Sequence, residues 1–313
     1  MRVAGAGVRV VDQPRPVGGE PVRVAAVGIC GSDLHLAGQG VPVTLGHEIA
    51  GYTASGGPVA VHPMQACRMC PACQRGLSQL CDQAGAVIAG VGLDGGMAEW
   101  VATPPGSLLP LPEDLDVKDG CLVEPTAVSV HGLRRAALQA GESVCIIGGG
   151  PIGLTTVAAA QHVGASVTVV ARYRHQQDAA AALGARVLTD ATSAGADIFD
   201  LVVDAAGSTE ALRGATELAR SGGRVLTLAT YWNPVVELDT TPLLRREVSI
   251  VPSRMYGALG PGSDFSAAAE LLALRPEVAT VLISHRFPLS EAAAAFALMA
   301  DRSRPKLKVV LEP

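Results

Sequence analysis

Four cysteines lie close together with the spacing C-x2-C-x2-C-x7-C, at Cys67, Cys70, Cys73 and Cys81. Thiolates this close match a tetrahedral zinc site of four cysteines, with bonds of about 2.3 Å and no open coordination position. Four unrelated buried thiols would not be expected at such spacing. A zinc ribbon that binds nucleic acid would need a basic, aromatic neighbourhood, which Arg68 and Arg75 alone do not supply. We therefore expect a structural zinc lobe over residues 66–82, in which the metal stabilises a loop with few apolar residues.

A second set of metal-ligand residue types precedes this lobe, at Cys30, His47 and Glu48. Cysteine, histidine and carboxylate are ligands of catalytic zinc sites, which keep one position open for water or substrate. A core cysteine and a surface His-Glu pair are the alternative interpretation. Gly31 and Gly46 allow tight backbone turns beside these residues, which favours the metal site.

A glycine-rich turn follows an apolar run at 144–147 and opens a helix of small residues at 152–163; it comprises Gly148, Gly149, Gly150, Pro151, Ile152 and Gly153. A G-x-G-x-x-G turn between strand and helix is typical of dinucleotide-binding domains. The first glycine permits the turn, the second lets the backbone approach a pyrophosphate, and the third packs helix against strand. The helix N-terminus would then face the phosphates.

The end of the next strand, at 167–170, indicates which cofactor the turn prefers. An NAD domain usually has an acidic residue about 20 residues after the glycines, where it binds the ribose 2′-hydroxyl. Here the chain reads Ala171, Arg172, Tyr173 and Arg174, with no acid between Gly164 and Gln177. Guanidinium groups bind phosphate bidentately, although two solvated surface arginines are the alternative. We predict that NADP is preferred over NAD.

The elements that must position these residues indicate an α/β fold with two domains. The first ~120 residues are rich in glycine and proline and predict irregular β-structure with long loops, with short β-branched runs at 8–11 and 22–27. A helix is expected at 121–138. Strands at 144–147, 167–170, 200–204 and 224–229 then alternate with helices at 152–163, 175–183 and 210–219, which predicts a parallel sheet with helices on both faces. Two helices at 265–274 and 290–299 and a strand at 306–311 complete the chain. We place a Rossmann domain at 126–251, inserted in a catalytic domain formed by 1–125 and 252–313.

Composition excludes several classes of protein. The net charge of −5 and an aromatic content of 3 % argue against nucleic-acid binding. No apolar run reaches the ~20 residues of a membrane span, and residues 1–7 contain no apolar core of signal-peptide length. We therefore expect a cytoplasmic protein without membrane partners. In a reducing compartment the cysteines are expected to be ligands or buried thiols, and Cys145, within an apolar strand, is expected to be a core thiol.

The order of these motifs resembles that of the zinc-dependent medium-chain dehydrogenase/reductase family. The motifs are G-I-C-G-S-D-x-H at 28–35, G-H-E at 46–48, the four cysteines, D-G-G-M-A-E at 94–99, the pair Glu124-Pro125, the glycine turn, S-H-R-F-P-L at 284–289 and K-V-V-L at 308–311. The chain is most similar to the sorbitol (polyol) and threonine dehydrogenase branch, because Glu124 stands where liver-type alcohol dehydrogenases have a cysteine. The resemblance implies a GroES-like β-barrel catalytic domain beside the Rossmann domain.

The resemblance also implies roles for individual residues. Cys30 and His47 would bind a catalytic zinc, with Glu48 and Glu124 competing for the remaining protein position. Asp33 would orient the zinc histidine. Ser32 and His35 match the proton relay of the family, although a turn-capping serine and a surface histidine are the alternatives. The cofactor would be lined by Ala206, Leu228, Ala229 and Thr230, and at its nicotinamide end by Ser253, Arg254 and Met255. Tyr231 and Trp232 are interpreted as ordinary interface aromatics rather than as walls of the cleft.

The implied activity is reversible hydride transfer between a secondary alcohol (a polyol, sugar derivative or cyclitol) and NAD(P), with two zinc ions per chain. Segments 31–46 and 48–66 are short for the family, which suggests a more open pocket for a bulky or cyclic polyol. A threonine-type amino-alcohol dehydrogenase would instead use Arg254 or Arg286 to bind a carboxylate. A non-catalytic, zinc-stapled nucleotide-binding module is a third possibility, which the catalytic residue set disfavours. A small-molecule alcohol or ketone is the expected partner, and a homodimer or homotetramer is the expected assembly.

Overall fold

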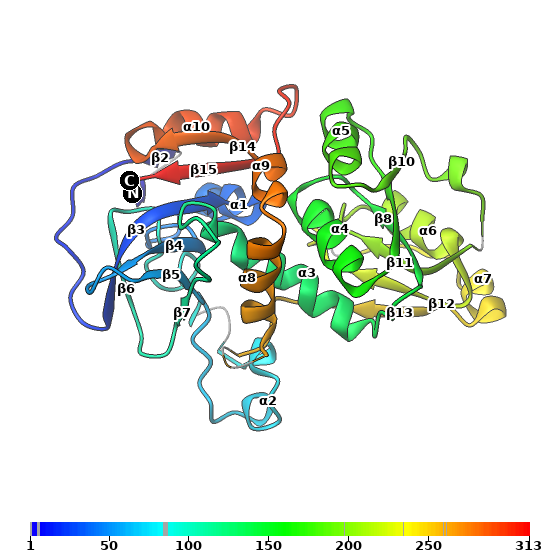
Figure 1. Cartoon of the computed structure of the whole chain (residues 1–313), viewed down its shortest axis with the longest axis horizontal. Helices are drawn as coiled ribbons and strands as arrows, with labels where there is room; N and C mark the ends of the chain where they lie inside the picture. Colours follow the sequence, from blue (N-terminus) through cyan, green and yellow to red (C-terminus); the bar gives the residue numbers. More distant parts are fainter. Residues whose placement is uncertain are drawn as a thin grey trace. The chain divides into compact units, whose positions relative to one another are not determined.

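The structure is a computed structural model that describes residues 2–4, 7–83, 87–196, 198–233, 235–258, 260 and 262–313. Met1, Gly5 and Ala6, part of the N-terminal segment in which we expect no signal peptide, lie outside the described residues. The chain divides into two compact units, which are described separately (Figure 1). The first unit comprises Met1–Glu124 and Gly257–Pro313, and the second comprises Pro125–Tyr256.

The second unit is built on a six-stranded sheet in which every neighbouring pair of strands is parallel. Its strands are β8 (Ser143–Ile147), β9 (Ser166–Val170), β10 (Arg186–Leu188), β11 (Phe199–Asp204), β12 (Ala219–Thr227) and β13 (Ser249–Pro252). The spatial order is β10-β9-β8-β11-β12-β13. Counted along the chain this order is 3-2-1-4-5-6, which is that of a dinucleotide-binding doubly wound sheet and confirms the predicted fold class.

Helices cover both faces of this sheet. They are α3 (Val123–Arg135), α4 (Pro151–Val163), α5 (Arg174–Ala182), α6 (Thr209–Leu218) and α7 (Thr240–Arg246), with a short 3-10 turn at Thr192–Ala194. Along β8, Cys145 and Ile147 pack with residues of α6, whereas Ile146 lies beside Gly153 of α4. Because successive strand residues point to opposite faces, α4 and α6 lie on opposite sides of the sheet. Pro151 at the first helical position and the left-handed Gly164 cap begin and end α4.

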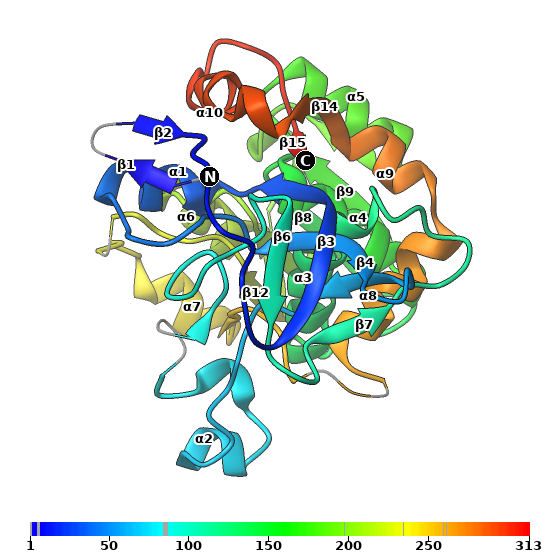
Figure 2. The same cartoon turned by 90° about the vertical axis from the view of Figure 1, so that its left-hand side faces the viewer.

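The first unit is built on a mixed seven-stranded sheet (Figure 2). Its strands are β3 (Glu20–Ile29), β4 (Glu48–Thr53), β5 (Pro58–Val61), β6 (Trp100–Thr103), β7 (Leu108–Pro110), β14 (Ile283–Pro288) and β15 (Lys308–Glu312). They follow the order β14-β15-β3-β4-β5-β7, and β6 also pairs with β3. A separate two-stranded sheet joins β1 (Arg2–Ala4) and β2 (Gly7–Arg9). The C-terminal β15 lies beside β3, which brings the end of the chain next to the strand that leads to Cys30.

The helices of this unit are short. They are α1 (Gly31–Gln39), α2 (Pro71–Gln74), α8 (Asp264–Leu274), α9 (Glu277–Leu282) and α10 (Ala292–Ala300), with 3-10 turns at Ser78–Leu80, Gly120–Leu122 and Leu289–Glu291. Of these, α2 lies in the lobe of the four cysteines, away from the sheet (Figure 1). The core joins β3, β4, β5 and β15 through residues such as Val27, Ile49 and Leu311, and α10 adds Phe296 and Leu298. Among the described residues, every helix is too short or too polar to cross a lipid bilayer.

Several predicted elements differ in extent from those observed. The strand expected at 224–229 begins at Ala219, where it pairs with Phe199 across an irregularity in β11, and it ends at Thr227. Leu228 and Ala229 therefore lie in the turn after β12. The helix expected at 121–138 starts as a 3-10 turn and ends at Arg135, before Ala137 with its positive φ of 51°. Helices α1 and α9 were not predicted, since neither carries a long apolar repeat.

Candidate metal centres and cofactor site

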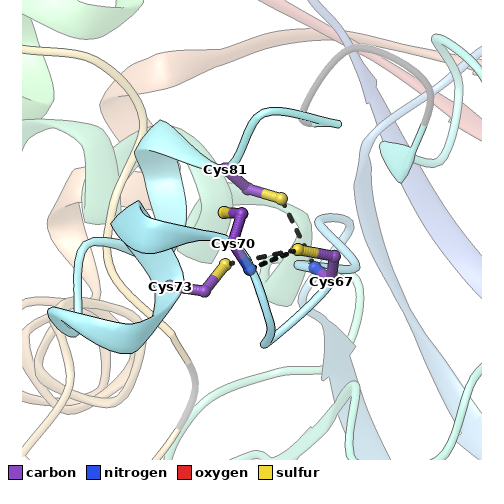
Figure 3. A group of neighbouring side chains, drawn as sticks. All are labelled: Cys67, Cys70, Cys73 and Cys81. Carbon is purple, nitrogen blue, oxygen red and sulfur yellow. Dashed lines mark hydrogen bonds between the residues drawn. The ribbon is translucent and has the colours of Figure 1, made fainter.

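The four clustered cysteines converge on one point within the loop between β5 and β6 (Figure 3). One ligand atom from each lies within 4.8 Å of all the others, and the Sγ atoms of Cys67 and Cys73 are 3.9 Å apart. Sulfurs bound tetrahedrally at ~2.3 Å are about 3.8 Å apart, so this spacing fits a zinc ion. The short helix α2 carries Cys73, and the 3-10 turn Ser78–Leu80 leads directly to Cys81.

Backbone N–H groups stabilise thiolates in this lobe. The N–H of Cys67 donates to Cys81 Sγ at 3.4 Å, and that of Cys70 donates to Cys67 Sγ at 3.3 Å. Backbone donors at Asp82 and Cys73 lower the pKa of the Cys70 thiol to about 6. Burial and the neighbouring Cys70 raise the pKa of Cys73 to about 12. Without a cation the four thiols therefore cannot all ionise near neutral pH, whereas a bound zinc would hold all four as thiolates.

The second ligand set forms where β3 ends and β4 begins. Cys30 follows β3 directly and is the N-cap of α1, while His47 and Glu48 lead into β4. One ligand atom from each of Cys30, His47 and Glu48 lies within 4.8 Å of the other two. Gly28 is paired with Glu48 across the two strands, and a Cβ on Gly28 would lie 1.9 Å from Glu48 Oε2. The absence of a side chain at Gly28 therefore makes room for the Glu48 carboxylate.

Asp33, which is fully buried, links the first two of these residues. Its Oδ2 accepts the backbone N–H of Cys30 at 2.8 Å, and its Oδ1 lies 3.5 Å from His47 Nδ1. Burial lowers the pKa of the His47 imidazole, but the nearby charge of Asp33 and the Cys30 thiol raise it, so the net pKa lies well above its usual value. An imidazole whose Nδ1 faces a carboxylate has a fixed ring orientation and is a more basic ligand through Nε2.

Lys308, the first residue of β15, binds Glu48. Its Nζ donates to Glu48 Oε1 at 2.6 Å and to Oε2 at 2.7 Å, and it also contacts the carbonyl oxygen of Ile29 at 3.3 Å. The two residues are 3 % and 1 % exposed. A buried carboxylate needs a partner of opposite charge, and Lys308 supplies it. The sequence interpretation assigned no role to Lys308, although a lysine opening the apolar run K-V-V-L was a visible signal.

The remaining predicted catalytic residues lie on α1 and at the start of α3. Ser32 is half-buried and His35 is exposed, with Gln39 Nε2 2.8 Å from His35 Nε2. They are three positions apart on α1, so they share one helix face that leads from the interior to solvent. Glu124 is buried in the first turn of α3, but it is not one of the three residues whose ligand atoms lie within 4.8 Å of one another.

The glycine turn follows β8 and opens α4. Gly148 has φ +112°, which favours glycine, and a Cβ on Gly153 would lie 1.9 Å from the carbonyl oxygen of Gly148. Gly150 is the N-cap of α4, whose free N–H groups at the first turn form an anion site. Gly149, Pro151 and Ile152 complete the turn. Gly148 and Gly153 therefore have the conformational and packing roles that the motif requires.

Comparisons with known proteins agree with this geometry. A family model described as alcohol dehydrogenase GroES-like domain matches residues 20–113, and one described as zinc-binding dehydrogenase matches residues 151–273. The 2-dehydro-3-deoxy-L-galactonate 5-dehydrogenase of Pseudoalteromonas atlantica is 31 % identical over 92 % of this chain and 90 % of its own length. This chain belongs to the zinc-dependent medium-chain dehydrogenase/reductase family. Its relatives place it on the sorbitol-like, polyol branch, and the predicted GroES-like and Rossmann folds are confirmed.

Two solved structures extend the comparison over the whole chain. Galactitol-1-phosphate dehydrogenase from Escherichia coli has a TM-score of 0.90, is 28 % identical, and is matched over 99 % of this chain and 98 % of its own. A protein of Sinorhizobium meliloti 1021, solved bound to NADP, has a TM-score of 0.88, is 31 % identical, and is matched over 100 % of this chain and 98 % of its own. These medium-chain dehydrogenase/reductase neighbours therefore share the architecture of both units.

The predicted cofactor residues of this medium-chain dehydrogenase/reductase gather at one edge of the parallel sheet. Ala171 follows β9, Ala206 follows β11, Leu228, Ala229 and Thr230 follow β12, and Ser253, Arg254 and Met255 follow β13. The carboxyl ends of parallel strands lie on the same edge, where open α/β sheets bind their ligands. Ser253 is tied to this edge because its N–H donates to the carbonyl oxygen of Thr227 at 3.1 Å.

The two arginines after β9 differ in their surroundings. Arg174 forms an exposed i,i+4 ion pair with Asp178, with Nε 2.8 Å from Oδ1. Arg172 is exposed, and its charge is one of the smaller contributions that lower the pKa of Glu210, after hydrogen bonds from the Glu210 backbone and Ser208. Both guanidinium groups are therefore accessible to an anion. The ion pair between Arg174 and Asp178 is exposed, and exposed pairs contribute little to stability.

Proposed function

We propose that this chain is a zinc-dependent oxidoreductase that transfers hydride reversibly between a secondary alcohol and NAD(P). The observation that supports this most strongly is the convergence of Cys30, His47 and Glu48, with Asp33 facing His47 Nδ1 and Lys308 paired with Glu48. A zinc ion bound there would act as a Lewis acid on a substrate hydroxyl. The nicotinamide held by the glycine turn would accept the hydride.

We propose that Cys30 and His47 bind this zinc and that Glu124 is the third protein ligand. Glu48 lies closer to Cys30 and His47, but Lys308 occupies both of its carboxylate oxygens. That pairing favours a role for Glu48 beside the metal rather than on it. Measured zinc content would separate the two carboxylates: Glu124→Ala should lose the catalytic zinc, whereas Glu48→Gln should retain it.

Asp33, Ser32 and His35 are assigned to orientation and proton transfer. Asp33 holds the His47 ring through Nδ1 and fixes the backbone of Cys30. Ser32 is the half-buried member that would accept the substrate proton, and His35 is the exposed member that would release it to solvent. Ser32→Ala should therefore lower kcat more than KM.

The substrate is proposed to be a polyol, sugar derivative or cyclitol. The support comes from the relatives, which act on a deoxy-galactonate and on galactitol 1-phosphate according to their names. The threonine-type alternative loses one of its candidate cations, because Arg286 is paired with Asp119 and with Glu312 at 2.5 and 2.9 Å. A panel of polyols, cyclitols, sugar acids and L-threonine, read by the absorbance of reduced nicotinamide, tests the assignment. Turnover by Cys30→Ala at the wild-type rate would refute the proposal that catalysis depends on zinc.

NADP is proposed as the preferred cofactor, with Arg172 and Arg174 binding its 2′-phosphate. The exposed guanidinium groups after β9 and the NADP-bound relative support this choice. Arg172→Ala should raise KM for NADPH by roughly tenfold and leave KM for NADH nearly unchanged. An equal effect on both cofactors, or no effect on either, would contradict the proposal.

A homodimer or homotetramer that forms through the second unit is also proposed. β13 is an outer strand of the six-stranded sheet, and its Ile250 is 39 % exposed. Outer strands with exposed apolar side chains pair readily with a second chain. Light scattering should report a dimer or tetramer for the wild-type protein and a smaller species for Ile250→Lys.

A further inference from the structure

The carboxylate of Asp204 lies at the centre of the sheet edge that carries the glycine turn. Asp204 is the last residue of β11, which is paired with β8 and β12 in the middle of the six-stranded sheet. It is fully buried. A carboxylate at such a position is costly unless its oxygens are hydrogen-bonded, so its partners indicate its purpose.

Asp204 binds the turns on both sides of it. Its Oδ1 accepts the backbone N–H groups of Ala206 at 2.8 Å and Gly207 at 2.9 Å. Its carbonyl oxygen accepts those of Leu228 at 3.0 Å and Ala229 at 3.2 Å. One residue therefore connects the turn after β11 with the turn after β12.

Tyr231 closes this network. Its hydroxyl donates to Asp204 Oδ2, and its ring is half-buried against the core around Cys145. Burial and the hydrogen bond and charge of Asp204 raise the pKa of the Tyr231 hydroxyl, which therefore stays protonated and donates throughout the neutral range. Tyr231 lies at the end of the turn at 228–231. Its hydrogen bond to Asp204 therefore holds the end of this turn that is farther from β12.

The turn after β11 lies against Gly148 of the glycine turn, and the turn after β12 lies against the turn after β11. A Cβ on Gly148 would lie 3.1 Å from the backbone of Ala205 and Ala206, and one on Gly207 would lie 2.8 Å from the carbonyl oxygen of Thr230. Gly207 also has a positive φ of 72°. Because these backbones touch without side chains between them, a shift of one turn would displace the others.

We propose that Tyr231 is a positioning residue for the dinucleotide, whose hydroxyl bond to Asp204 holds the turns at 205–207 and 228–231 in the arrangement that binds the cofactor beside the glycine turn. This inference rests on the proposed nicotinamide-dependent function. It also revises our interpretation of Tyr231 as an ordinary interface aromatic. Tyr231 does not touch reacting atoms in this assignment, and its effect should appear in cofactor binding rather than in the chemical step.

The test is Tyr231→Phe in the full-length, zinc-loaded protein, which removes one oxygen and keeps the ring. The Kd for NADPH, followed by the fluorescence of the reduced nicotinamide, and the KM for the cofactor should rise roughly 5- to 20-fold, as expected for loss of a hydrogen bond to a charged group. The kcat and the KM for the alcohol should stay within about twofold. Tyr52→Phe, in the first unit, is the matched control and should change neither value.

A second variant tests whether the effect of the Tyr231 hydroxyl depends on the Asp204 carboxylate. Asp204→Asn retains an acceptor for Ala206 and Gly207 but changes the partner of Tyr231, so adding Tyr231→Phe to it should produce less than about a twofold further change. Wild-type Kd in Tyr231→Phe, or equal loss of kcat and of every KM, would overturn the assignment. A wild-type protein that binds neither NADPH nor NADH would instead overturn the proposed function itself.

Discussion

Replacing Lys308 by methionine should destabilise the first unit strongly. The ammonium and the Glu48 carboxylate are 3 % and 1 % exposed and are joined by two contacts of 2.6 and 2.7 Å. Removing one partner of a buried ion pair leaves an uncompensated charge and costs about 3–5 kcal/mol. That loss is a large part of the ~5–15 kcal/mol by which a domain is stable.

The double variant separates the charge from the packing. Lys308→Met combined with Glu48→Gln leaves no buried charge at this position and should recover at least half of the lost free energy of unfolding. The matched control is Lys118→Met, which removes an exposed pair with Glu312 whose Nζ–Oε2 distance is also 2.7 Å. The lysine of that pair is 53 % exposed, so its loss should cost less than about 1 kcal/mol.

The assay is urea unfolding of the zinc-loaded protein in a Trp232→Phe background. The chain has two tryptophans, and this background leaves Trp100, in β6, as the reporter of the first unit. If Lys308→Met costs no more than Lys118→Met, or if the double variant is no more stable than Lys308→Met, then the buried charge of Glu48 does not depend on Lys308.

Three further predictions concern other parts of the chain. Cys70→Ser should reduce the zinc content from two ions to one per chain and increase proteolysis within residues 66–82, as read by metal analysis and limited digestion. Gly28→Ala would place its Cβ 1.9 Å from Glu48 Oε2 and should lower both kcat and thermal stability; unchanged kinetics would contradict the packing. Hydrogen bonds from Ser143, with a smaller contribution from Arg220, lower the pKa of Asp200 to about 2, so Asp200 stabilises the fold above its ordinary pKa and ceases to do so as the pH falls from about 4 to 2. Asp200→Asn should therefore be less stable by about 1 kcal/mol at pH 7, after allowance for solvent screening, and the difference measured in urea should shrink between pH 5 and pH 3.

Local patterns predicted the parallel sheet well because its signals lie within a few residues. The apolar run at 144–147 corresponds to β8, Ser143–Ile147, and the glycines that follow adopt the turn that their sequence indicates. The start of β12 was missed, because the irregular pairing at Phe199 depends on a neighbouring strand. A strand end read from one segment alone cannot register such a partner.

The sequence alone does not predict contacts between distant segments of the chain. Glu48 and Lys308 are 260 positions apart, and only the pairing of β15 with β3 brings them together. Tyr231 and Asp204 lie closer in sequence. Even so, Tyr231 can donate to the Asp204 carboxylate only because of the path of the turn after β12, which the sequence does not predict. In both cases the topology of the sheet brings a residue type that is common on surfaces next to a buried carboxylate.

The charges that the two proposed zinc sites would carry differ, and Lys308 lies at only one of them. A zinc ion bound by four thiolates would have a net charge of −2, and Cys67, Cys70 and Cys73 are partly exposed to solvent that would screen this charge. At the proposed catalytic site, zinc bound by the Cys30 thiolate and one carboxylate would have a net charge of zero, and a second, free carboxylate would leave an uncompensated negative charge. The ammonium group of Lys308, on β15, compensates the charge of the Glu48 carboxylate. A neutral zinc site of this kind would suit an uncharged hydroxyl, which is the group that the proposed alcohol substrate presents.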